Sequence, residues 1–335
     1  METRVQTVCL VLISTVLTGA ALYWLRPVMV PFVMALFITL GLRAGAEFLE
    51  QRARVPHSLA LAATILLGLA FLAGVGVLVS VSVGEFTAKA DLYNAYLRQL
   101  VEQAAGLAPP QFRLGQEEVF SNISVSTVGG FLGRTANAIA ATLSNSFVVL
   151  VFVLFLMLGG QRRRRAGGMW GEAEQRIKRY LATKALTSLA TGLFVGLTLI
   201  LLGVPLALMF GLLAFVLNFI PSVGSIAATL LPLPILLVSP EISTEVAVAA
   251  MAVPTVIQLT IGSFLEPKLL GESLDLHPAT ILLSLILWGT LWGILGMILS
   301  VPITVVVKIL CERFEGSRPV ADLLAGRTDA LVGGT

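Results

Sequence analysis

Long uninterrupted apolar runs, separated by short charged segments, dominate the pattern of this chain. The first run covers residues 5–25 without a charge, and a second, over 27–42, follows after only Arg26. A helix needs about 20 apolar residues to cross a bilayer, and the runs are continuous, whereas barrel strands would alternate. The later runs cover residues 58–84, 135–160, 185–240, 246–265 and 276–307. The pattern predicts an all-α polytopic integral membrane protein with about eight hydrophobic segments.

The composition of the 335 residues fits lipid as the main solvent. Hydrophobic residues make up 57% and charged residues 12%, against about 25% charged in soluble domains. The net charge is +3, but the Lys and Arg residues cluster between the apolar runs and form no stripe with aromatic residues. We therefore expect the lipid bilayer as a partner and no nucleic acid.

Sequence signatures of catalysis and of metal binding are missing from the chain. It has no phosphate-binding loop, no H-E-x-x-H pair and no G-x-S-x-G turn, and it has only two histidines and two well-separated cysteines. We expect no enzyme activity, no catalytic residue, no cofactor and no metal site.

Charge in the connecting segments predicts the orientation and the domains. Residues 43–57 hold three basic residues and 161–184 hold eight, so both segments, and with them the N-terminus, are expected in the cytoplasm. We predict three transmembrane helices over 1–84 and an extracytoplasmic amphipathic helical region over 85–134. A transmembrane transport core over 135–312 and a cytoplasmic or flexible tail over 313–335 would follow.

Two late segments, 205–238 and 276–310, are too long for a single straight span. Each has about 35 residues, which is about 50 Å of helix against a bilayer core of about 30 Å. Glycine and proline gather near the middle of each segment. We predict two broken or re-entrant helical hairpins, which are typical of transporter sites. Two ordinary tilted spans with packing glycines are the alternative.

Polar residues beside these breaks are the candidates for a solute or ion pathway. Asn218 lies at the first break, and Glu266 and Lys268 flank Pro267 directly after an apolar run. A carboxylate and an ammonium where a helix breaks could bind an ion or relay protons. They could equally be solvated loop charges. For Gln258, which stands alone, we expect a hydrogen bond to a neighbouring helix.

Three motifs, in order and spacing, resemble the autoinducer-2 exporter family over about residues 10–312. Residues 215–224 resemble its F-x-x-N-x-I-P-x-x-G signature, and 266–271 with 276–278 resemble its E-P-x-x-x-G and L-H-P stretch. Residues 288–297 resemble its W-G-x-x-W-G-x-x-G-M signature. Ser222 and Ser225 stand where the family often has an aromatic residue and a proline.

The resemblance implies a multi-pass bacterial inner-membrane protein and a homo-oligomer. It also implies a secondary transporter, not driven by ATP, that exports a small polar solute such as autoinducer-2. A sodium–proton antiporter is the first alternative, and a non-transporting structural or regulatory membrane protein is the second. The predicted pathway residues are Asn218, Pro221, Gly224, Glu266, Pro267, Lys268, Gly271, Asp275, His277, Trp288, Gly289, Gly293 and Gly296.

Overall fold

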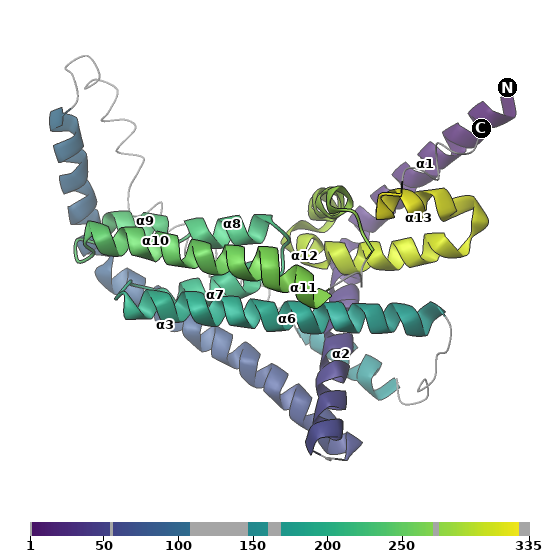
Figure 1. Cartoon of the computed structure of the whole chain (residues 1–335), viewed down its shortest axis with the longest axis horizontal. Coiled ribbons are helices and arrows are strands. Elements are labelled where there is room, and N and C mark those ends of the chain that lie inside the picture. Colours follow the sequence, from purple (N-terminus) through teal and green to yellow (C-terminus); the bar gives the residue numbers. More distant parts are fainter. Residues whose placement is uncertain (1, 54–55, 108–146, 160–168, 271–274, 328–335) are drawn as a thin grey trace. The chain divides into compact units, whose positions relative to one another are not determined.

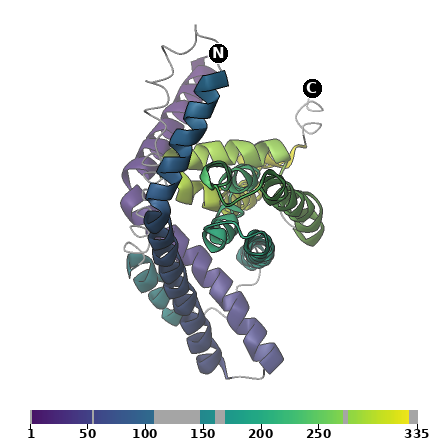
Figure 2. The same ribbon diagram turned by 90° about the vertical axis from the view of Figure 1, so that its left-hand side faces the viewer.

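The described part of the chain is helical throughout. A computed structural model describes residues 2–53, 56–107, 147–159, 169–270 and 275–327, and these ranges contain no strand (Figures 1 and 2). Within them, five helices are long and apolar enough to cross a membrane: Arg26–Glu47, Leu59–Ser82, Glu174–Leu201, Thr244–Leu269 and Pro278–Arg313. The predicted all-α polytopic membrane protein is confirmed.

The helices follow the apolar runs, and their caps and prolines set several of the boundaries. The labelled elements are α1 (Glu2–Trp24), α2 (Arg26–Ala53), α3 (His57–Leu107), α6 (Met169–Leu201), α7 (Ala207–Leu217), α8 (Val223–Leu230), α9 (Leu233–Val238), α10 (Thr244–Leu259), the π-helix η3 (Thr260–Leu265), α11 (Glu266–Leu270), α12 (Pro278–Arg313), the 3-10 helix η5 (Glu315–Ser317) and α13 (Arg318–Ala325). A further apolar helix covers Phe147–Gly159.

The chain divides into two compact units, and α3 and α6 contribute to both. Unit 1 consists of Met1–Thr64, Asn145–Thr183 and Leu270–Thr335, and unit 2 consists of Ile65–Ser144 and Lys184–Leu269. Each of the two late segments that were predicted to be broken lies in a different unit.

Unit 1 is built around α12, which packs against α1, α2 and α13. Tyr180 of α6 joins one apolar cluster with the second half of α12, and Phe37 of α2 joins another around Leu299. Inside α12, Gly293 has φ 67° and ψ −146°, so the segment is two helices joined at a kink. Residues with side chains strongly disfavour that backbone conformation. The second predicted break is therefore present, at Gly293.

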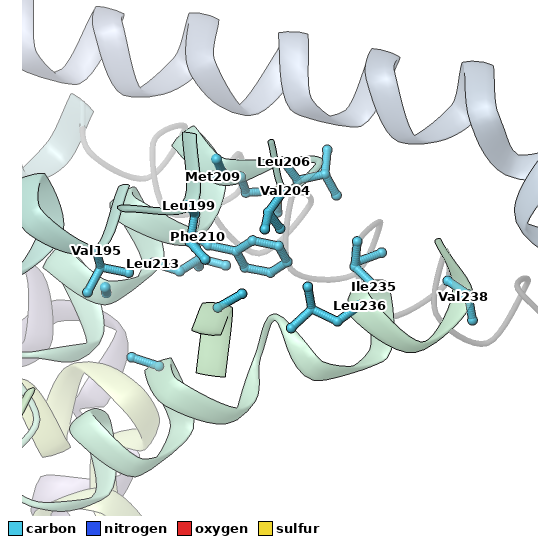
Figure 3. Packing of buried hydrophobic residues seen from close by; sticks show 14 residues of the cluster. Val195, Leu199, Val204, Leu206, Met209, Phe210, Leu213, Ile235, Leu236 and Val238 are labelled. Carbon is cyan, nitrogen blue, oxygen red and sulfur yellow. The ribbon is translucent and has the colours of Figure 1, made fainter. Parts of the chain in front are cut away.

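The core of unit 2 packs α6, α7 and α9 around Phe210. Figure 3 shows the Phe210 ring among labelled side chains of all three helices, including Leu199 and Leu236. The α6 and α7 backbones nearly touch, because a Cβ placed on Gly211 would lie 2.8 Å from the Cα of Gly196. Small residues allow such close approach of helices in membranes.

Helices cross or follow two of the predicted domain boundaries, and the domain division itself stays a prediction. The helix α3 continues through residue 84, where we predicted a separate amphipathic region, and ends at Leu107. Past Arg313, where we expected a tail, η5 and α13 form and pack on α12. The rest of the 85–134 region, and residues 328–335, lie outside the described residues.

Candidate functional site

The first predicted break separates α7 from α8 in unit 2. Ser222 has φ 59° and ψ −56°, and the Val223 amide donates to the Pro221 carbonyl at 2.6 Å. These values describe a γ-turn with positive φ, a rare and strained conformation. Non-glycine residues with strained backbone conformations are found mostly at binding and switch sites. The turn therefore marks this region as a candidate site.

Gly224 lets the chain fold back closely after this turn. A Cβ placed on Gly224 would lie 1.8 Å from the carbonyl oxygen of Leu217, so the position has no room for a side chain. The Gly224 amide donates to the Ile220 carbonyl at 3.1 Å, which begins α8. The break therefore has a compact geometry that depends on glycine.

Asn218 fastens the break to α6. Its Nδ2 donates to the Ser188 hydroxyl at 3.0 Å, and its side chain is buried. Ser188 belongs to a buried polar face of α6 with Lys184, Thr187 and Thr191, spaced as one helix face is spaced. Asn218 is thus an interhelical anchor, and its predicted contact with a solute stays a prediction.

A pocket of about 510 Å³, with a mostly apolar surface that includes several polar groups, lies beside this break. Its wall is one face of α8 opposite one face of α10 and η3, with Lys184 of α6 alongside. The polar wall residues are Lys184, Ser222, Ser225, Thr229, Thr255, Gln258, Ser263 and Glu266, and the others are Pro221, Ile226, Leu230, Leu259 and Gly262. The size and the mixture of apolar surface with a few polar groups are typical of small-molecule sites.

An ion pair closes one part of this wall. Lys184 Nζ lies 2.6 Å from Glu266 Oε1, with the lysine side chain 4% and the carboxylate side chain 16% exposed. Each residue lies within a helix long and apolar enough to span a membrane. A buried ion pair is stable only if its geometry is good enough to offset the cost of removing both charges from water. This pair leaves no net charge at the wall, and its two side chains are free to separate.

The π-helix η3 positions Glu266 at the pocket. The α10 helix contains Pro254, which lacks an amide proton, and turns into η3 at Thr260. Single-turn π segments inside helices occur frequently at functional sites. Thr255, Gln258, Gly262 and Glu266 all reach the same wall.

The neighbouring predicted residues are not part of the wall. Pro267 and Lys268 are exposed on α11, and neither lines the pocket. Gly271 lies outside the described residues. Of the predicted residues in unit 2, Pro221 and Glu266 line the pocket, and Asn218 and Gly224 shape the break beside it.

The second break, in unit 1, is packed with aromatic rings. Trp288 and Trp292 lie with ring centroids 5.0 Å apart and share an apolar cluster with Val30 of α2. Trp292 Nε1 donates to the Leu22 carbonyl at 3.1 Å. The polar atom of this ring is thus already paired within unit 1.

The glycines of α12 serve this packing. A Cβ on Gly296 would lie 1.9 Å from the carbonyl oxygen of Trp288, and one on Gly289 would lie 3.0 Å from the Met297 side chain. Gly293 provides the kink. All the predicted residues of 288–296 are therefore placed at the break, where their contacts are with the protein's own backbone and side chains.

Asp275 and His277 hold the C-terminal helix. Asp275 bonds to Lys308 Nζ at 2.8 Å and pairs with Arg327, which follows α13. The His277 amide donates to the Leu324 carbonyl at 3.0 Å, and its Nδ1 accepts from the Ala279 amide at the start of α12. These contacts clamp α13 to α12.

Partial burial by itself raises the pKa of the Asp275 carboxyl. The hydrogen bond and charge of Lys308, with the charges of Arg327 and Arg176, outweigh burial and hold that pKa below its ordinary value. The carboxylate is therefore charged at neutral pH and stabilises the clamp.

Comparison with known proteins places the chain in a family. Residues 12–316 match the AI-2E family transporter. A protein of Haemophilus influenzae is 31% identical over 90% of this chain and 91% of its own length. The AI-2 transport protein TqsA of Escherichia coli is 31% identical over 89% of each chain. The protein YhhT of Escherichia coli is 29% identical over 98% of this chain and 97% of its own length.

The chain belongs to the AI-2E family. It is therefore a bacterial membrane protein of a transporter family, and the predicted resemblance is confirmed. The names of its relatives describe transport and no catalysed reaction.

Several wall residues of this AI-2E transporter were not predicted from sequence. Lys184 was counted as a loop charge, but it is buried on α6. Its spacing from Thr187, Ser188 and Thr191 was a usable signal, because residues at i, i+3, i+4 and i+7 share a helix face. Gln258 was expected to bond to a neighbouring helix, and among the described residues it has no hydrogen-bond partner.

Proposed function

We propose that this AI-2E family member is a secondary transporter that exports a small, neutral, hydroxylated solute such as autoinducer-2. The pocket beside the Ser222 turn would hold the solute. The observation that carries the proposal is a pocket lined by α8 and by residues of two helices long enough to span a membrane, with a wall that combines hydroxyl, amide and ion-pair groups. The relative TqsA is named an AI-2 transport protein, which supports the same solute class.

The charge balance of the wall favours a neutral solute. Lys184 and Glu266 are the ionisable residues of the wall, and they neutralise each other at 2.6 Å. A charged solute would add an unbalanced charge in a region of low dielectric, which is costly. Hydroxyl groups, in contrast, can donate to and accept from the serine, threonine and glutamine side chains of the wall.

The ion pair is the proposed coupling element. Separation of Lys184 from Glu266 would free a carboxylate for a proton or a monovalent cation inside the membrane region. This observation also favours the second candidate, a sodium–proton antiporter, because such proteins use intramembrane carboxylates. A pH-gradient dye assay in proteoliposomes separates the two: sodium-dependent proton release without a solute supports antiport.

The setting of the protein is part of the proposal. We infer an inner-membrane location with a cytoplasmic N-terminus, because the basic residues cluster in 43–57 and 161–184. We also infer transport without ATP hydrolysis, lipid contacts over the exposed apolar helix faces, and a homo-oligomer. The resemblance of the three motifs supports the oligomer.

The test is solute flux in proteoliposomes that contain the purified chain. We expect wild-type protein to move autoinducer-2 without ATP and Glu266→Gln to lower that flux about tenfold or more, because loss of one charge leaves Lys184 unpaired. The matched control is Glu241→Gln, since Glu241 is an exposed carboxylate of unit 2 outside the pocket wall. Absence of wild-type flux, or equal flux in Glu266→Gln and Glu241→Gln, contradicts the proposal.

A further inference from the structure

Gln258 is a buried amide without a hydrogen-bond partner. Gln258 is 5% exposed and lies on the pocket wall. Within the described residues, neither its Oε1 nor its Nε2 has a hydrogen-bond partner. An unpaired buried polar group is destabilising, and most such groups in proteins are paired. Thr39 and Ser239 of the described residues also have an unpaired buried hydroxyl, but of these three residues only Gln258 lines this pocket.

The neighbouring hydroxyl groups do not supply that partner. The Thr255 hydroxyl donates to the Met251 carbonyl at 2.6 Å, and the Thr229 hydroxyl donates to the Ser225 carbonyl at 2.9 Å. Both donors are thus used within their own helices. The buried amide of Asn218 in the same unit differs, because its nitrogen is paired with Ser188 at 3.0 Å. Packing between helices accounts for Asn218 and leaves Gln258 unexplained.

We propose that Gln258 is the specificity-determining residue of this pocket and recognises two adjacent oxygen atoms of the solute by hydrogen bonds. Its Nε2 donates to one oxygen, and its Oε1 accepts from a hydroxyl group beside it. The inference rests on the proposed transport of a hydroxylated solute through the same pocket. It names the chemical feature that is selected: a donor and an acceptor side by side on a neutral molecule.

The other wall groups exclude different ligand classes. A carboxylate ligand would require Lys184, which Glu266 already holds at 2.6 Å. An apolar ligand would fill the pocket but leave both polar atoms of Gln258 unpaired. A site built to hydrogen-bond a hydroxyl group rejects the analogue without one far better than an apolar pocket discriminates by size.

The experiment compares two probes on the full chain in detergent and in proteoliposomes. The probes are autoinducer-2 and 2-methyltetrahydrofuran-3-one, a furanone ring without hydroxyl groups. The variant is Gln258→Met, which keeps the length of the side chain and removes its polar atoms. The control is Thr260→Val, an exposed position of the adjoining η3 that does not line the pocket.

Wild-type protein should be stabilised against heat by autoinducer-2 and much less by the furanone. In Gln258→Met we expect the half-saturating autoinducer-2 concentration for flux to rise about tenfold, since two hydrogen bonds are lost. The preference between the two probes should vanish, while the melting temperature of the empty protein stays equal or rises. Thr260→Val should behave as wild type. If Gln258→Met does not fold, Gln258→Leu tests the same loss, because it also removes both polar atoms of the side chain.

The outcomes separate the two proposals. Wild-type flux with an unchanged half-saturating concentration and an unchanged probe preference in Gln258→Met overturns the role of Gln258 and leaves the transport proposal standing. Absence of autoinducer-2 flux and binding in wild type removes the transport proposal itself.

Discussion

The two broken helices share a close contact between a glycine and a backbone carbonyl, but the surroundings of the two breaks differ. In each, a glycine lies against a carbonyl oxygen of the preceding helix: Gly224 against Leu217 in unit 2, and Gly296 against Trp288 in unit 1. The unit 2 break borders a pocket whose wall includes several polar groups, whereas the unit 1 break is filled by Trp288 and the paired indole of Trp292. A break in a membrane helix is therefore not in itself a solute site.

The two breaks also differ in whether their buried polar side-chain atoms have hydrogen-bond partners. The indole nitrogen of Trp292 donates to the Leu22 carbonyl, so this polar atom of the unit 1 break is satisfied. Gln258 on the unit 2 pocket has both polar atoms unpaired among the described residues. Buried polar groups that are satisfied stabilise a fold, whereas an unpaired buried polar group is costly.

The buried lysines repeat this contrast. Lys308 has two carboxylate partners, Asp275 at 2.8 Å and Glu312 at 3.0 Å, and the clamp of α13 lies around them. Lys184 has the single partner Glu266 in the ion pairs of the described residues, at the edge of a pocket. Lys308 would keep one carboxylate partner if the other were lost. Lys184 would have no ion-pair partner among the described residues if Glu266 moved away.

The largest expected effect comes from a side chain at either crossing glycine. Gly224→Ala and Gly296→Ala place a Cβ within 2 Å of a backbone carbonyl oxygen, so the backbone must move. We expect each to lose about 3 kcal/mol or more of stability. Thermal unfolding in detergent measures this, with Gly76→Ala as the control because open space surrounds it. Melting temperatures equal to that of the control would show that the breaks differ from the described geometry.

The two buried lysines should respond unequally to removal. Lys184→Met leaves Glu266, 16% exposed, without its cation, and we expect a loss of about 3 kcal/mol. Lys308→Met should cost less, because Asp275 keeps Arg327 as a partner. Flux per folded molecule should fall only in Lys184→Met. Chemical unfolding and proteoliposome flux on the same preparations check both parts, and equal losses of flux would remove the contrast.

Removal of the paired indole nitrogen of Trp292 should lower the stability, whereas removal of the unpaired amide of Gln258 should not. Trp292→Phe leaves the Leu22 carbonyl without its donor, and we expect it to cost about 1–2 kcal/mol. Gln258→Met removes an unpaired amide and should be neutral or stabilise by about 1 kcal/mol. Melting curves of the empty protein decide this, and a marked loss in Gln258→Met would indicate a partner for the amide.

The smallest effect is a pH dependence of the C-terminal clamp. The pKa of Asp275 is depressed in the folded protein, so the clamp is stabilised above the unfolded value of about 3.9 and loses that stabilisation as the pH falls below it. The difference in melting temperature between wild type and Asp275→Asn should therefore shrink between pH 6 and pH 3. A difference that grows on acidification would contradict the direction of the shift.

The sequence predicted the spans and the breaks well, because both follow from the length of apolar runs and from glycine and proline. Two of the residues it named, Pro221 and Glu266, line the pocket, and their contact with a solute stays a prediction. Lys184 was missed because a lysine at the end of a basic segment looks like a loop charge. Gln258 was misjudged because whether an amide is paired depends on neighbours from other helices, such as Thr229 of α8, which spacing within one helix does not report.

The most direct test of the account compares thiol reactivity at the two breaks. Cys9 and Cys311 are first replaced by alanine, and a single cysteine is placed at Ser225 or at Leu291, both half-buried, in unit 2 and unit 1 respectively. We predict that Ser225→Cys reacts with a charged hydrophilic thiol reagent and that autoinducer-2 slows the reaction. Leu291→Cys should react slowly and without protection. No reaction at residue 225, or equal protection at both positions, would contradict a solute pocket confined to the unit 2 break.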